Sequence, residues 1–217
     1  MIYGTPLFDR ISTQKKERIL SYAGKEFAQK GYVGANINVI AKNIGISVGS
    51  LYQYFGTKEN LFLATVHRGR RELEVVIEKN AMLETSFLGK IENLIEAVQV
   101  HSRRNPDSIL LYAELTAEGN NSIADRLSSE METITARYYT ELISYYQKKG
   151  IITNKGEPHY LAFFIDNLLL TLQFSYVNAY YRERMKVFLH KENVDNDETL
   201  KEALTEFISN SLGVTNE

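Results

Sequence analysis

The sequence contains no cysteine and no tryptophan, and only three of its 217 residues are proline. The absence of cysteine excludes a disulfide framework, a thiolate zinc site and a cysteine nucleophile. Proline at about 1.4%, against a usual ~5%, disfavours disorder and frequent breaks between elements. A chain of this length suits one domain of ordinary size or two small ones.

Signals for export or membrane insertion are also lacking. The first ten residues have no basic start followed by an apolar core, so no secretory signal is expected. The apolar stretch 160–181 is interrupted by four polar residues, Asp166, Asn167, Gln173 and Asn178. Such a stretch is poor as a membrane span and typical of a helix buried on most sides. We expect a reduced, cytoplasmic protein with no membrane partner.

Motifs for catalysis and metal binding are missing as well. The four histidines are scattered, and none has metal-ligand spacing with a second one: His67, His101, His159 and His190. There is no glycine-rich phosphate loop, nucleophile elbow or paired-carboxylate motif. The sequence therefore predicts neither an enzyme nor a metal or cofactor site.

The charge of the chain is unevenly distributed. Residues 10–58 carry eight lysines and arginines but only two glutamates, a net charge of +6, although the whole chain has a net charge of −2. The remainder must then carry −8. A basic first segment on an acidic body suggests a polyanionic partner for that segment alone. A merely solvated basic helix face is the alternative reading.

Helical periodicity dominates, and no convincing period-2 strand is present. A first helix is expected over residues 12–30, ended by Gly31. Asn36 and Ser47 are expected to cap two short helices, with a left-handed Gly45 between them. Longer helices are expected at 59–80, 86–104, 106–118, 122–149, 157–189 and 197–212. The fold class is therefore all-α.

Two short helices joined by a tight glycine-containing turn, behind a longer supporting helix, are typical of a helix-turn-helix. In the second short helix, Leu51 and Phe55 are spaced to face the core. Small or polar side chains are left for the opposite face, which could enter a DNA groove. The arm 1–8 has no positive charge, so we expect Ile2, Leu7 and Phe8 to pack on a neighbour.

Residues 40–61 carry a more specific pattern. They read Ile40-Ala41, Gly45-Ile46-Ser47-Val48-Gly49-Ser50-Leu51-Tyr52-Gln53-Tyr54-Phe55 and Lys58-Glu59-Asn60-Leu61. This pattern resembles the DNA-binding domain of TetR-family transcriptional regulators. The family often has threonine where Asn36 stands, and a basic residue where Val48 stands. Val48 removes one guanine contact and could meet a thymine methyl instead.

The resemblance implies an N-terminal three-helix helix-turn-helix domain, residues 1–58 with its motif core at 36–55. A larger helical domain, residues 59–217, would bind an effector and form a homodimer through the last two long helices. The implied DNA contacts are Asn36, Ser47, Val48, Gly49, Ser50, Tyr52, Gln53, Tyr54 and Lys58. Val48, Gly49, Ser50 and Tyr52 would lie nearest base edges, and most of the others would hold phosphates.

Some of these residues could have a structural role in place of a DNA contact. Tyr52 and Tyr54 could instead be surface tyrosines packed on the following helix. Lys58 begins a helix, where the positive end of the dipole disfavours a cation. No structural role for Lys58 is evident from the sequence, which favours a phosphate contact.

The family usually lines its effector pocket with residues at the positions of His101, Tyr112, Glu114 and Thr116. Aromatic and polar residues of the later helices, including Tyr139, Asn167 and Phe174, could complete such a pocket. They would suit a small hydrophobic or cationic molecule. The alternative is that the many aromatic residues of these helices form core and dimer interface.

The sequence thus predicts a ligand-responsive DNA-binding transcriptional regulator, a homodimeric repressor released from a palindromic DNA operator by a small molecule. Two other hypotheses stay open: a DNA-binding protein of the same fold whose body contacts a protein partner, and a helical module that binds no DNA.

Overall fold

The computed structural model describes residues 3–115, 121–190 and 194–215, with the backbone alone for 115 and 121–132. Throughout this part of the chain the protein is helical, and its one β-bridge, between Ile152 and Val214, is isolated. Contacts divide the chain into two compact units. The first comprises Met1–Leu73 and Asp107–Ala124, and the second Glu74–Pro106 and Asp125–Glu217. The functional division expected at residue 58 stays a prediction, because these units are defined by packing alone.

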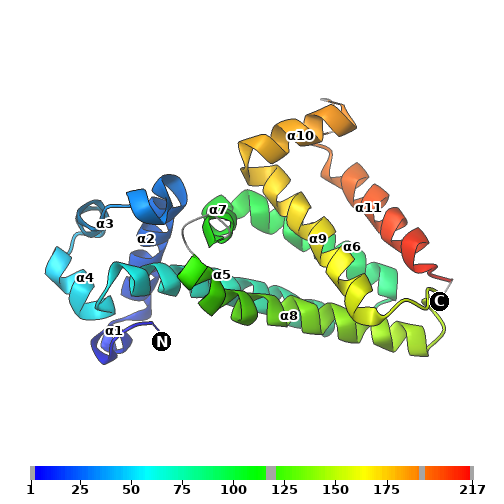
Figure 1. Ribbon diagram of the computed structural model, residues 1–217, viewed down its shortest axis with the longest axis horizontal. Helices are drawn as coiled ribbons and strands as arrows, with labels where there is room; N and C mark the ends of the chain where they lie inside the picture. Colours follow the sequence, from blue (N-terminus) through cyan, green and yellow to red (C-terminus); the bar gives the residue numbers. More distant parts are fainter. Residues whose placement is uncertain (1–2, 116–120, 191–193, 216–217) are drawn as a thin grey trace. The chain divides into compact units, whose positions relative to one another are not determined.

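The first unit is built on helices α1 to α4, the start of α5, and α7 (Figure 1). Their bounds are α1 Pro6–Arg10, α2 Thr13–Gly34, α3 Ile37–Ile44, α4 Val48–Phe55, α5 Lys58–Ala81 and α7 Pro106–Leu115. Fully buried apolar side chains form its core, among them Phe8, Ile19, Phe27, Ile40 and Phe62. The expected helices α2 to α4 are confirmed, and Gly31 interrupts α2 with a left-handed φ of 68°.

Helix α1 was not expected from the sequence, although the packing of Phe8 was. The Phe8 ring is fully buried, 4.5 Å from the ring of Phe55 between centroids. Thr5 donates from its backbone N–H to Tyr54 O at 2.8 Å and from its hydroxyl to Gln53 O at 2.7 Å. These bonds satisfy carbonyls at the end of α4 that lack helical partners. Ile2 lies outside the described residues.

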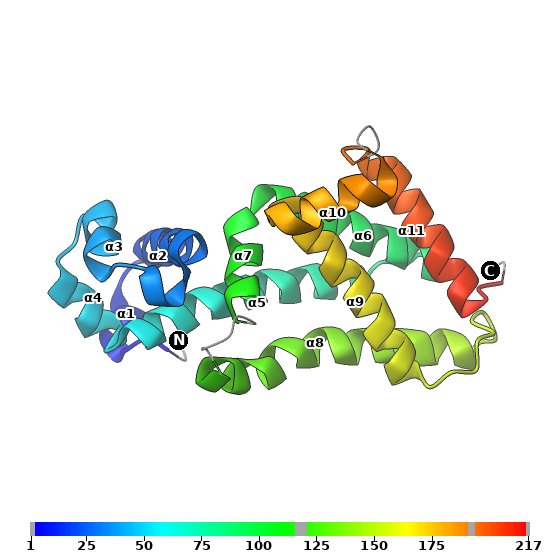
Figure 2. The same ribbon diagram turned by 45° about the horizontal axis from the view of Figure 1, so that its top comes forward.

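The second unit contains the end of α5 and the remaining helices (Figure 2). Their bounds are α6 Phe87–Arg104, α8 Asn121–Lys148, α9 Pro158–Val177, α10 Ala179–Leu189 and α11 Asp197–Leu212. Helix α9 packs against α6 and α10, and α11 packs against α6. A polar network joins α6, α9 and α11, because Arg103 and Tyr176 both donate hydrogen bonds to the Asp197 carboxylate.

The single helix expected over 157–189 is wrong, because the chain breaks into α9 and α10 at Asn178. Asn178 has extended backbone angles, and its side-chain oxygen accepts hydrogen bonds from the N–H groups of Tyr180 and Tyr181. An asparagine side chain competes in this way with the backbone bonds of a continuous helix. The long run of apolar residues on both sides of Asn178 favours one continuous helix, so the sequence did not indicate this cap.

Helix α9 is the one helix among the described residues that is long and apolar enough to cross a membrane. Its best 18-residue window has a mean hydropathy of 1.3, and 28% of that window is buried. Core helices of water-soluble proteins pass the same test, so length and composition are weak support for a membrane span. The modest burial instead marks α9 as a helix with a large uncovered apolar face.

Candidate nucleic-acid interface

Helix α4 separates buried from exposed side chains along its length. Leu51 and Phe55 are buried in the first unit, as expected. The opposite face carries Gly49, Gln53 and Tyr52, and the Tyr52 side chain is 47% exposed. Val48 and Ser50 are half-buried. Apart from Tyr54, the predicted contacts on α4 therefore lie on the face that a DNA groove could accept.

Side-chain caps begin both short helices, and a glycine turn joins them. The Asn36 side chain accepts from Asn38 N at 2.9 Å, and the Ser47 hydroxyl accepts from Ser50 N at 3.0 Å. Between them Gly45 has φ 77° and ψ 37°, and its N–H donates to Ala41 O at 3.0 Å. This left-handed position suits glycine because it has no Cβ. The caps and the turn predicted from the sequence are confirmed.

Tyr54 differs from the other predicted contacts because its ring lies in the core. Only 7% of the residue is exposed, and its ring lies 5.9 Å from that of Phe8. Its hydroxyl accepts a hydrogen bond from Lys15 Nζ at 3.1 Å. The alternative that Tyr54 is a surface tyrosine is therefore wrong, because helical spacing places it beside Leu51 and Phe55. A phosphate contact through its hydroxyl stays a prediction.

Lys58 has the structural role that the sequence did not reveal. Its Nζ donates to Val33 O at 3.1 Å and to Ala35 O at 2.7 Å, and it lies 5.3 Å from the centroid of the Tyr32 ring. The lysine thus binds carbonyls at the end of α2, where a cation is favoured. The premise that Lys58 lacks a structural role is wrong, and its phosphate contact stays a prediction.

Glu114 of α7 also binds the end of α2, at a backbone N–H group near the carbonyls that Lys58 binds. Its Oε1 accepts a hydrogen bond from Tyr32 N at 2.7 Å, next to the left-handed Gly31. A Cβ on Gly31 would lie only 3.0 Å from that oxygen. Burial raises the pKa of the neighbouring Tyr32 phenol. The chain between α2 and α3 is therefore clamped by Glu114 at an N–H and by Lys58 at two carbonyls.

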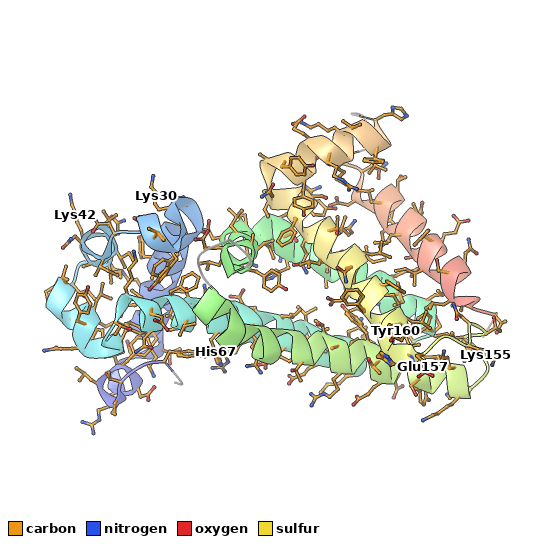
Figure 3. The ribbon with its side chains drawn as sticks, viewed as in Figure 1. Lys30, Lys42, His67, Lys155, Glu157 and Tyr160 are labelled. Atoms are coloured by element: carbon orange, nitrogen blue, oxygen red, sulfur yellow. The ribbon has the colours of Figure 1, made fainter. Side chains whose placement is uncertain are left out.

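Several cations of the first unit project into solvent. Lys30 and Lys42 point outward from α2 and α3 (Figure 3), and Arg18 and Lys25 are also exposed. Within the described ranges none of these four forms an ion pair. Lys16, by contrast, donates to Asp9 O at 2.8 Å. Unpaired exposed cations supply the sequence-independent attraction for a phosphate backbone.

The residues predicted for an effector pocket are spread over both units. Tyr112 and Glu114 are on α7, and Thr116 lies outside the described residues. In the second unit, His101 faces Asn105, Asn167 is exposed, and Tyr139 and Phe174 are wholly or partly buried. Burial raises the pKa of the Tyr139 phenol well above its usual value. Whether these residues share a pocket stays a prediction.

A cavity of about 1010 Å3 in the second unit is lined by other residues. It lies among the end of α5, the start of α6 and the last turns of α8, with Glu84, Glu141 and Tyr145 on its wall. None of the seven predicted pocket residues lines it. Sequence periodicity could not reveal this cavity, because its wall joins residues about 60 positions apart.

Comparisons with known proteins agree with this geometry. The profile of the tetR family of bacterial regulatory proteins matches residues 19–65, which include α3 and α4. The transcriptional repressor AcnR of Corynebacterium glutamicum is 35% identical over 72 residues, 33% of this chain and 38% of that repressor. The negative regulator of the icaADBC biofilm operon, IcaR of Staphylococcus epidermidis, is 24% identical over 82% of this chain and 91% of its own length.

Solved structures share the fold across both units. Salmonella enterica GusR superposes with a TM-score of 0.71 at 22% identity, covering 92% of this chain and 96% of that one. FadR of Bacillus subtilis, solved in complex with stearoyl-CoA, has a TM-score of 0.69 at 14% identity, covering 88% and 96%. These likenesses identify the fold. Residues 19–65 of the chain therefore carry the DNA-binding segment of the tetR family of bacterial regulatory proteins, and the protein is a DNA-binding transcription regulator and not an enzyme.

Proposed function

We propose that this protein is a homodimeric repressor that reads a palindromic operator with α4 and is released when a small molecule binds its second unit. The observation that carries the proposal is the outward face of α4, where Gly49, Ser50 and Tyr52 lie opposite the buried Leu51 and Phe55. Asn36, Ser47, Val48, Gln53, Tyr54 and Lys58 complete the proposed DNA contacts. A cytoplasmic location follows from the proposed access to DNA.

The proposed homodimer is supported by the uncovered face of α9. Tyr160, Phe163 and Phe164 are 60%, 62% and 59% exposed, and Phe207 on α11 is 56% exposed. Exposed aromatic patches of this kind mark interaction sites, because water disfavours them. A two-fold pair of α9 and α11 helices would cover these side chains. It would also supply the second α4 that a palindrome requires.

Release by an effector would follow from a population shift. The two α4 helices of a dimer must lie about 34–36 Å apart to reach successive major grooves. A ligand lowers the population of that arrangement only if it binds the other arrangement more tightly. Coupling energies of this kind are typically about 1–3 kcal/mol. Helix α5, which begins at Lys58 and ends at Ala81, would carry the change.

Binding-site selection on genomic DNA with the purified full chain tests the proposal. We expect a near-palindromic site, bound by one dimer, with affinity that falls steeply as salt rises. Recovery of no preferred sequence, or of a site without two-fold symmetry bound by a monomer, would reject it.

A body that contacts a protein partner is the second candidate. The observation in its favour is on α10, where Tyr180, Val187 and Phe188 are 73%, 78% and 68% exposed. A thermal-shift screen with apolar and cationic compounds separates the two candidates. Ligand-induced stabilisation supports an effector, and a well-folded protein that none of them stabilises favours the protein partner.

A further inference from the structure

The polar groups that line the cavity of the second unit determine which class of molecule it can bind. It opens where the segment between α5 and α6 faces the last turns of α8. Its volume of about 1010 Å3 is at the upper end of the ~300–1000 Å3 typical of small-molecule sites. Leu83, Leu142 and Ile151 give it aliphatic walls. The chemistry of a guest is therefore set by the few polar groups that face the space.

Lys90 is the buried cation of this wall, and all of its hydrogen-bond donors are occupied. Its Nζ donates to Asn80 O at 3.1 Å, to Ala81 O at 3.2 Å and to Leu83 O at 2.7 Å. An ammonium group has three N–H donors. These three bonds cap the end of α5 and leave no donor for an anionic guest.

Two tyrosine hydroxyls likewise donate hydrogen bonds to other groups of the protein. Tyr138 donates to the Asn80 side-chain oxygen, and Tyr146 donates to Thr85 O at 3.4 Å. Burial raises the pKa of Tyr138 to about 12, so the phenol keeps this proton at neutral pH. The N-terminus of α6 is closed by the Ser86 hydroxyl, which accepts from Gly89 N at 3.0 Å. The hydroxyls of Tyr138 and Tyr146 therefore have no proton left to donate to a guest.

Two carboxylates add negative charge to the wall. Glu84 and Glu141 both line the cavity at exposed positions. Within the part of the chain that the structure describes, neither forms a hydrogen bond or an ion pair. Carboxylates accept hydrogen bonds and donate none when ionised. They are suited to a guest that brings positive charge or N–H donors.

The ring of Tyr145 already receives a cation. The Lys149 ammonium lies 4.5 Å from its centroid, within the range in which a cation is attracted to an aromatic face. Lys149 is exposed on a flexible stem near the end of α8. A guest cation could take its place over the ring while the lysine turns to solvent.

We propose that this cavity binds an organic cation with an apolar body, held by Glu84 and Glu141 and by the Tyr145 ring. This site rests on the proposed function, since it specifies the effector class for the second unit. Its residues are distinct from the seven predicted from the sequence. Displacing Lys149 from Tyr145 on binding gives the site a measurable signature.

Titration calorimetry on the full chain with three matched probes tests the site. The probes are 4-phenylbutyltrimethylammonium, 4-phenylbutanol and 4-phenylbutyrate, which share a body and differ in charge. We expect the cation to bind most tightly and the carboxylate least tightly. Glu84→Gln combined with Glu141→Gln should weaken the cation by about tenfold or more, because charge-assisted contacts are lost.

Two further variants test whether the cavity prefers a cation. Lys149→Met should tighten cation binding by roughly threefold or more, because the competing ammonium is gone. Glu202→Gln is the matched control, since it removes one exposed carboxylate on α11 away from the cavity wall and should leave binding unchanged. Equal binding of all three probes, tighter binding of the carboxylate, or no binding at all would overturn the proposal.

Operator binding by the ligand-free protein separates this proposal from the proposed function. If the protein binds a selected palindrome but the cation does not bind in the cavity, the proposed cation site is wrong and the proposed DNA-binding function is unaffected. If no palindrome is recovered, the proposed function fails whatever the cavity binds.

Discussion

Gly49 is the residue of α4 whose small size the fold does not require. A Cβ built on Gly49 would lie 3.7 Å from Ser47 Oγ, an ordinary contact distance. Glycine in a helix costs up to about 1 kcal/mol relative to alanine, so the protein has no evident stability reason to keep it. We therefore propose that Gly49 allows the backbone of α4 to approach DNA closely.

Gly49→Ala should therefore leave the thermal midpoint unchanged or slightly raised while it weakens operator binding by about tenfold, because the added methyl group holds the backbone away from the bases. Fluorescence anisotropy with a labelled operator measures the loss. Gly69→Ala on α5 is the matched control, since its Cβ would lie 3.8 Å from the Ser108 side chain. Unchanged affinity in Gly49→Ala would show that DNA does not approach this backbone.

Substitutions of Lys42 and of Lys58 distinguish a lysine that contacts phosphate from one that stabilises the fold. Lys42 is exposed, whereas Lys58 binds Val33 O and Ala35 O. Lys42→Met should lower the slope of log affinity against log salt by about 1 if it meets a phosphate, without loss of stability. Lys58→Met should lower the unfolding free energy by roughly 1–3 kcal/mol, because two charge-assisted bonds are lost.

Chemical unfolding and salt titration of both variants check this contrast. A stable Lys58→Met protein with a lower salt slope would make Lys58 a phosphate contact first and a structural residue second. A destabilised protein with an unchanged slope would assign Lys58 to the fold alone.

The connection between α2 and α3 depends on a contact from a distant helix. Glu114 accepts from Tyr32 N, while Glu26 accepts from Asn36 N at 3.1 Å a few residues later. Glu114→Ala should expose the Tyr32 amide and speed its hydrogen exchange at least tenfold, because its partner is lost. The Asn36 amide, still held by Glu26, is the internal control. Equal exchange at Tyr32 in both proteins would show that the clamp contributes nothing.

The network at the start of α11 should make stability depend on acid pH. Hydrogen bonding from Arg103 holds the pKa of the Asp197 carboxyl below its usual value, and Tyr176 adds a second bond. A carboxyl whose pKa is lowered on folding stabilises the protein above its unfolded pKa, near 3.9, and this stability is lost as pH falls toward the folded pKa. The partly exposed pair keeps the effect modest.

Thermal midpoints of the wild type and Asp197→Asn should therefore differ at pH 7, and the difference should shrink as the pH falls below about 4 toward the lowered pKa of the folded protein. Arg103→Gln should show the same convergence, because it removes the group that lowers the pKa of Asp197. A difference that stays constant over this range would exclude a role for the charge of Asp197.

Local signals in the sequence predicted the elements of the first unit well. Asn36, Gly45 and Ser47 act on backbone groups within three or four residues, so their identity and spacing are sufficient to predict the turn. Contacts made across long stretches of chain were missed. Neither the bond that Tyr32 N donates to Glu114 nor the bond that Lys58 donates to Val33 O can be read from periodicity, because each depends on how separate helices pack.

The same limit applies to the second unit and its cavity. Helical spacing predicted most helices there, but the cap at Asn178 was hidden by its apolar neighbours. The cavity joins Glu84 to Glu141, which are 57 residues apart, and no sequence motif links them. Family likeness could point to a pocket in the helical body, but the choice of wall residues depends on side-chain packing specific to this chain.

At the scale of the whole molecule, the proposed recognition of a palindromic operator requires a dimer, which we propose forms through the exposed face of α9. Phe163→Glu places a charge on that face, where Phe163 is 62% exposed. Burying an unpaired charge between subunits is strongly unfavourable, so we expect a folded monomer. Analytical ultracentrifugation measures the change, and Val187→Glu on α10, at 78% exposed, is the matched control that stays dimeric.

DNA binding should change with assembly in a defined way. A dimer gains from holding both half-sites at once, because the second contact becomes intramolecular. Phe163→Glu should therefore lose at least about a hundredfold in affinity for a full palindrome and little for a single half-site. If the monomeric variant bound both DNAs as the wild type does, two-fold recognition would be rejected. A Phe163→Glu protein that stayed dimeric would instead place the subunit interface away from this face of α9.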